Sequence, residues 1–115
     1  ETPSPVTLID KAEFSCFANE NFKTKLAALN RRQIILTGIE THVCIYQTAA
    51  NLLAEGYSVD VAADAVSSRT LANKKTALKR LRAEEANITS TEMTLFELLK
   101  TAQHPEFKQV AKLIK

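Results

Sequence analysis

The sequence predicts an α/β protein with an open parallel β-sheet, and three observations lead to this prediction. Segments with strand and helix patterns alternate along the chain, which is typical of such sheets. The apolar run 33–37 shows no polar alternation, as expected of a strand buried on both faces of a parallel sheet. Only two Gly and three Pro occur among 115 residues, which argues against a turn-rich β-sandwich. A chain of this length can form a single small domain with one core.

The first half of the chain begins with a strand pattern followed by a helix pattern. Residues 6–10 are partly β-branched and follow Pro5, where a strand can begin without losing a ladder hydrogen bond, so we predict a strand. Apolar residues at helical spacing predict an amphipathic helix over 19–29. The run 33–37 is then the second predicted strand.

The clearest helix pattern follows this second strand. Apolar and small residues recur at i, i+3, i+4, i+7 and i+8 from Ile45. Thr41 is predicted as the N-cap, and Gly56 as the glycine that ends the helix. With a further strand over 59–63, residues 33–63 predict a βαβ unit with a right-handed crossover.

The second half of the chain continues the alternation. Residues 67–68 are predicted to cap a helix over 70–83, and 87–89 form a last short strand. Helices are predicted over 92–102 and 105–114, the latter opened by a proline. The last helix carries an apolar stripe formed by Phe107, Val110, Ala111 and Ile114. This stripe could pack on a neighbouring subunit, so we expect a homo-oligomer.

Charge and composition exclude several classes of partner. The 15 Lys and Arg residues against 13 Asp and Glu give a net charge of +2, too balanced for a dedicated polyanion binder. A basic cluster lies in the helix over 70–83, but no aromatic residue interleaves it and two glutamates follow at 84–85. We therefore predict a solvated helix face and no nucleic-acid partner.

The cysteine count and the lack of long apolar segments indicate the cellular compartment of the protein. The two cysteines are too few for a disulfide scaffold and are expected to be free thiols. No stretch approaches the roughly 18 apolar residues of a membrane span, and the first residues lack a signal-peptide pattern. The sequence therefore predicts a cytoplasmic protein without a membrane partner.

Candidate chemistry lies at the carboxyl ends of the predicted strands, where open parallel sheets bind ligands. These ends are 10–11, 38–44 and Asp64. Cys44 falls in the first turn of a helix, where the helix dipole and free N–H groups stabilise a thiolate. Lys11, if it lies across the same crevice, would stabilise the thiolate further. From spacing alone, Cys44 is either a nucleophile or, more often in proteins, a small core residue.

Two separated motifs resemble those of the isochorismatase-like cysteine hydrolases. The first is GIETHVCIYQTA at 38–49, followed by GY at 56–57 and DAVSSR at 64–69. The second is DKAEFSCF at 10–17, which resembles the family's lysine motif, a Lys followed by Phe-Ser-x-Phe. The end of the chain, 90–115, resembles the subgroup called isochorismatase domain-containing proteins.

The resemblance implies a three-layer α/β/α fold and specific roles for site residues. Cys44 would be the nucleophile, and Lys11 the cationic member of an Asp-Lys-Cys triad. The family usually has a cis peptide at the position of Ile39–Glu40, and the N–H groups of Glu40 and Cys44 would form the oxyanion hole. The substrates implied are small amides or related C–N compounds.

Further residues near the motifs have two interpretations each. Phe14, Phe17 and His42 are candidates for the substrate pocket, although the aromatic pair could equally belong to the core and His42 to a turn. Cys16 is expected to serve packing. Because His104 is the only other histidine, we expect no metal site and no cofactor. Strand-end hydrogen bonds and helix capping are expected of Asp64 and Ser68.

One part of the family pattern has no counterpart in this sequence. The triad Asp of the family lies on an N-terminal strand, far upstream of the lysine. The family sheet has the order 3-2-1-4-5-6, of which this chain would supply strands 3 to 6. We therefore expect residues 1–115 to be the C-terminal portion of a single hydrolase domain whose N-terminal part is its missing partner. The alternative is a non-catalytic scaffold or interaction domain of the same fold.

Overall fold

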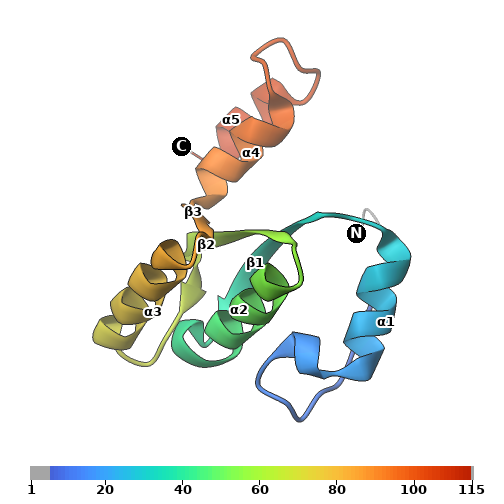
Figure 1. Cartoon of the computed structure of the whole chain (residues 1–115). Helices are drawn as coiled ribbons and strands as arrows, with labels where there is room; N and C mark the ends of the chain where they lie inside the picture. The colour runs from blue at the N-terminus through green and yellow to red at the C-terminus, as the bar shows by residue number, and fades with distance from the viewer. Residues whose placement is uncertain (1–5, 115) are drawn as a thin grey trace.

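The computed structural model describes residues 6–114, which form a three-stranded parallel sheet with helices around it (Figure 1). The strands are β1 (Gln33–Ile39), β2 (Ser58–Ser67) and β3 (Asn87–Thr89), in the order β1-β2-β3. Both pairings are parallel, with Ile34 opposite Val59 and Val61 opposite Ile88. The predicted α/β class is confirmed, and so is the adjacency of the last three predicted strands.

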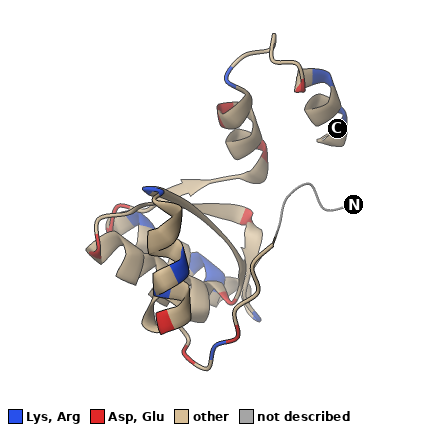
Figure 2. Ribbon diagram, turned by 90° about the vertical axis from the view of Figure 1, so that its right-hand side faces the viewer, with Lys and Arg blue, Asp and Glu red and all other residues tan. Residues whose placement is uncertain are grey.

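The helices occupy the positions that the apolar periodicity predicted, with small differences at their ends. Their bounds are α1 (Glu20–Leu29), α2 (Tyr46–Ala54), α3 (Leu71–Ala83), α4 (Thr91–Leu99) and α5 (Phe107–Leu113). A 3₁₀ turn (Cys16–Ala18) precedes α1, and a π-helical turn (Thr41–Ile45) leads into α2. In both ribbon views, α4 and α5 project away from the sheet and the other helices (Figures 1 and 2). None of the helices among residues 6–114 has the length and apolar character needed to cross a bilayer.

The core lies between β2 and the helices α2 and α3. Leu52 of α2, Val61 of β2 and Leu81 of α3 are completely buried. Val59, two residues before Val61, and Val66, near the end of β2, are also buried. This packing fixes the start of α2 above the carboxyl ends of β1 and β2.

The predicted strand over 6–10 is wrong. The segment is irregular and largely exposed, with 74% of Val6 and 91% of Leu8 accessible to solvent. A strand requires a neighbour whose backbone groups pair with its own, and within the described residues β1 pairs only with β2. The segment instead borders an apolar groove, which Thr7 and Ile9 line together with α1.

Two predicted caps are also wrong. Thr41 lies inside the π-helical turn, after Glu40, and its buried hydroxyl has no hydrogen-bond partner among the described residues. Helix α3 is capped by Thr70, whose side chain accepts from Asn73 N at 3.2 Å, because β2 extends through Ser67. The predicted serines therefore start no helix.

Other helix ends differ less. Gly56 follows α2 with φ +90°, a conformation that glycine adopts without steric cost, as predicted. The last helix begins at Phe107 rather than Pro105, after a turn in which the Phe107 N–H donates to His104 O.

Candidate functional site

The turn that carries Cys44 begins where β1 ends. The Ile39–Glu40 peptide bond is cis, and the carbonyl of Glu40 accepts hydrogen bonds from Val43 N and Ile45 N, both at 3.1 Å. Cys44 is half-buried and lies in the π-helical turn that leads into α2. Its thiol is therefore held at the carboxyl edge of the sheet by a turn with its own hydrogen bonds.

Lys11 comes from a different part of the chain and reaches the same thiol. Its Nζ lies 3.8 Å from Cys44 Sγ. The same ammonium donates to the carbonyls of Glu13 at 2.8 Å and Phe14 at 3.1 Å. These carbonyls fix the position of the ammonium beside the sulfur.

The loop that carries Lys11 is joined to α2 by two hydrogen bonds. Ser15 Oγ donates to Asn51 Oδ1 at 2.6 Å, and Cys16 N donates to Thr48 Oγ1 at 2.8 Å. Neither Thr48 nor Asn51 is among the site residues predicted from the sequence. The available signal was their spacing, four and seven residues after Cys44, which is that of one helix face.

A second link joins the ends of β1 and β2. The carboxylate of Glu40 accepts from Arg69 N at 3.0 Å, Nε at 3.2 Å and Nη2 at 3.1 Å. The hydrogen bonds from the Arg69 side chain, and then from its backbone, hold the pKa of the Glu40 carboxyl below its usual value of 4.5. The same pair raises the pKa of Arg69. Both side chains are therefore charged near neutral pH, and Glu40 is tied to the β2–α3 loop.

The three pocket candidates have different surroundings. His42 Nδ1 lies 3.0 Å from Ser68 Oγ, so this histidine connects the Cys44 turn to the β2–α3 loop. Phe17 packs against the core and meets Tyr57 edge to face, with ring centroids 6.3 Å apart. Phe14 is 61% exposed at the loop tip.

Other residues singled out in the sequence serve local structure. Cys16 and Cys44 are both free thiols, as predicted. Asp64 lies within β2 and not at a strand end as predicted, because β2 continues to Ser67; its Oδ1 accepts from Thr91 N at 2.8 Å and Thr91 Oγ1 at 3.0 Å. Over residues 6–114, His, Cys, Asp and Glu side chains form no group of three or more that could hold a metal ion.

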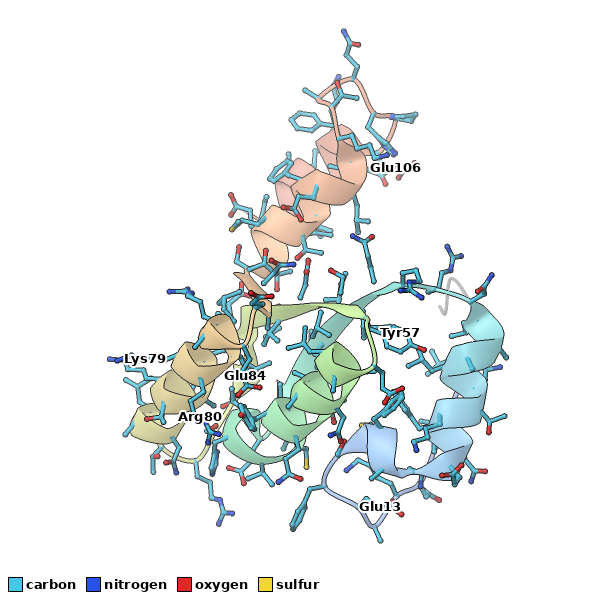
Figure 3. All side chains as sticks on the ribbon, in the orientation of Figure 1. Glu13, Tyr57, Lys79, Arg80, Glu84 and Glu106 are labelled. Atoms are coloured by element: carbon cyan, nitrogen blue, oxygen red, sulfur yellow. The ribbon has the colours of Figure 1, made fainter. Side chains whose placement is uncertain are left out.

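The basic cluster of α3 is partly used in packing. Arg80 lies over the ring of Tyr46, 4.6 Å from its centroid, and the Tyr46 hydroxyl donates to Glu84. Figure 3 shows Arg80 and Glu84 on the side of α3 toward α2. The hydrogen bond to Glu84, together with burial, raises the pKa of the Tyr46 hydroxyl. Basic and acidic positions are interspersed along the chain (Figure 2).

Comparisons with known proteins agree on one family. The family model described as "Isochorismatase domain" matches residues 2–93. The secreted isochorismatase effector Isc1 of Phytophthora sojae is 44% identical over 118 residues, covering 100% of this chain and 55% of the relative. Isochorismatase domain-containing protein 2 of Xenopus laevis is 43% identical over 104 residues, covering 90% and 51%. The chain spans about half the length of these curated relatives.

Solved structures show the same likeness. The MAR1 ribonuclease from Caenorhabditis elegans superposes with a TM-score of 0.82 at 39% identity, covering 91% of this chain and 53% of that one. The nicotinamidase PncA from Bacillus subtilis superposes with a TM-score of 0.66 at 23% identity, covering 70% and 44%. The second likeness concerns the fold alone.

Proposed function

Because this chain belongs to the isochorismatase family, we propose that the protein is a cysteine hydrolase that acts on a small amide-like substrate. The observation that carries the proposal is the distance of 3.8 Å between Lys11 Nζ and Cys44 Sγ. The two residues are 33 positions apart in the sequence. A lysine fixed beside a half-exposed thiol at the carboxyl edge of a parallel sheet has the arrangement of an activated nucleophile.

The reaction proceeds through a covalent thioester. The Cys44 thiolate attacks the carbonyl carbon, and the N–H groups of Glu40 and Cys44 stabilise the oxyanion that forms. The C–N bond then breaks, and the amine leaves with a proton from the triad acid. Water then gives one proton to the triad carboxylate and attacks the thioester, which releases the carboxylic acid and restores the thiolate and the triad acid. Lys11 places its ammonium beside the sulfur that bears this charge.

The triad acid belongs to the part of the domain that the family places before this chain. We propose that this N-terminal part docks on β1 and on the groove beside α1. Ile35 and Ile39 expose apolar surface along β1, and the groove is lined by Phe22, Leu26 and Leu29. Exposed apolar surface beside an open strand edge favours pairing with further strands. Phe14, Phe17 and His42 then form part of the pocket wall on this side.

The rate of thiol alkylation tests the proposal directly. The intact protein is treated with iodoacetamide at pH 7, and modification of Cys44 and Cys16 is followed by peptide mass spectrometry. We expect Cys44 to react at least about tenfold faster than Cys16, because the Cys44 thiol lies beside the Lys11 ammonium. Replacing Lys11 with methionine should remove this difference. Equal slow rates would instead support the non-catalytic scaffold, which has the same fold without turnover.

Compartment and assembly belong to the same proposal. Two free thiols fit a reducing cytoplasm, whereas the Phytophthora relative is named a secreted effector. Fractionation of the native cells decides between these locations.

We also propose a homo-oligomer, which light scattering of the purified protein would detect. A similar fold occurs in YcaC from Escherichia coli, described as an octameric hydrolase. The predicted apolar stripe of α5 (Phe107, Val110, Ala111 and Ile114) is half-buried, and Leu113 of the same helix is exposed.

A further inference from the structure

The loop over 11–16 touches the helical segment formed by the Cys44 turn and α2 at three successive places. Lys11 Nζ lies beside Cys44 Sγ, Cys16 N donates to Thr48 Oγ1, and Ser15 Oγ donates to Asn51 Oδ1. Thr48 and Asn51 are four and seven residues beyond Cys44, so they continue along one helix face. The nucleophile and the two loop contacts therefore share a single rigid element.

The two hydrogen bonds at residues 15 and 16 each include one buried partner. Thr48 is 1% exposed and Ser15 is 5% exposed, whereas Asn51 and residues 11–14 are exposed. Because water has limited access to the buried partner, these two bonds are less easily replaced than the exposed contacts of the loop. The position of the loop relative to α2 depends on them.

The remaining polar contacts of the loop hold its own shape. Lys11 donates to the carbonyls of Glu13 and Phe14, and Asn19 donates to the Glu13 carboxylate at 3.2 Å. These contacts join residues within the same segment. They keep Lys11 fixed in the loop but do not fix the loop on α2.

From this arrangement we infer that Thr48 and Asn51 are positioning residues that hold the Lys11 ammonium beside the Cys44 thiol. The inference rests on the proposed function and adds two residues that act on the reacting sulfur through Lys11. Neither residue needs to touch the substrate. Without its anchors, the loop moves from α2 and takes the ammonium with it, since Lys11 is tied to the loop backbone.

Two substitutions test this role in the intact protein. Thr48→Val keeps the side-chain shape and removes the acceptor, and Asn51→Ala removes the other acceptor from an exposed position where folding is not at risk. Both should slow alkylation of Cys44 by iodoacetamide at pH 7 by roughly three- to tenfold. Thr48→Ser, which retains the hydroxyl, should restore the rate.

A matched control and a double-mutant cycle separate positioning from a general loss of structure. Thr94→Val makes the same change on α4, where the buried hydroxyl has no partner within the described part of the chain, and it should leave the rate unchanged. In a Lys11→Met background, Thr48→Val should cause no further loss, because the ammonium is already absent.

The outcomes distinguish this inference from the proposed function. If wild-type Cys44 reacts fast and Lys11→Met slows it, yet Thr48→Val and Asn51→Ala do not, the inference is overturned and the proposed function stands. An equal loss from Thr48→Val with and without Lys11 also overturns the inference, since it indicates a structural role. If wild-type Cys44 and Cys16 react equally slowly, both proposals fail together.

Discussion

The carboxylate of Glu40 accepts hydrogen bonds from both the backbone and the guanidinium of Arg69, which ties the end of β1 to the loop after β2. The backbone of Glu40 also accepts from two N–H groups of the turn that carries Cys44. The ion pair is therefore directly connected to one of the two amides proposed for the oxyanion hole.

Arg69→Ala should slow acyl transfer without slowing alkylation. Acylation of Cys44 by p-nitrophenyl acetate develops an oxyanion, whereas alkylation by iodoacetamide does not. We expect a roughly tenfold lower acylation rate, because the Glu40 amide is no longer held in place, and an unchanged alkylation rate. Release of p-nitrophenolate and mass spectrometry measure the two rates.

Two variants accompany this comparison. Arg69→Lys keeps the charge but not the planar fork, so an intermediate acylation rate is expected. Arg82→Ala removes an arginine from the end of α3 and should change neither rate. Equal slowing of acylation and alkylation by Arg69→Ala would contradict a role confined to the oxyanion.

Asp64 gives a pH-dependent contribution to stability. The hydrogen bond from the Thr91 backbone, followed by that from its side chain, lowers the pKa of this carboxyl below its usual 3.8. The contribution is therefore complete above pH 3.8 and is lost as pH falls through the lower, folded-state pKa. Thermal melts of wild type and Asp64→Ala should differ at pH 6 and converge in strong acid. A constant difference across this range would contradict the linkage.

Leu52→Ala should destabilise the protein strongly. The side chain is completely buried between α2 and the sheet, and its truncation leaves a cavity that typically costs about 2–5 kcal/mol. Urea unfolding of the intact protein measures the loss. Leu71→Ala is the control, since that leucine is exposed at the start of α3 and should change stability by no more than about 0.5 kcal/mol.

The basic side chains of α3 are expected to give no specific RNA binding. Arg80 is engaged with Tyr46, although a protein of similar structure is named a ribonuclease. Fluorescence anisotropy with a labelled single-stranded RNA should show no saturable binding at 150 mM salt. Tight binding that weakens steeply with salt, and is lost when Lys74, Lys75 and Lys79 are replaced by alanine, would disprove this prediction.

Local patterns were sufficient to predict most of the regular structure. The helix around Leu52 and the strand around Ile35 were predicted because helical periodicity and continuous apolar runs involve residues a few positions apart. The strand predicted over 6–10 was wrong because a strand also needs a paired neighbour, which its own residues do not specify. The cap of α3 moved to Thr70 because β2 continues by several residues beyond its predicted end.

For the candidate site, too, some features could be predicted from the sequence and others depend on how the chain packs. Sequence patterns alone were enough to predict the parallel α/β architecture and, through the two family motifs, to single out Cys44 and Lys11. The packing of the chain sets the 3.8 Å between these side chains, the hydrogen bonds of Thr48 and Asn51 to the lysine loop, and those of Arg69 to Glu40. These contacts join residues 29 to 36 positions apart, and such distances are set by how strands and helices pack, not by the local preferences of either segment.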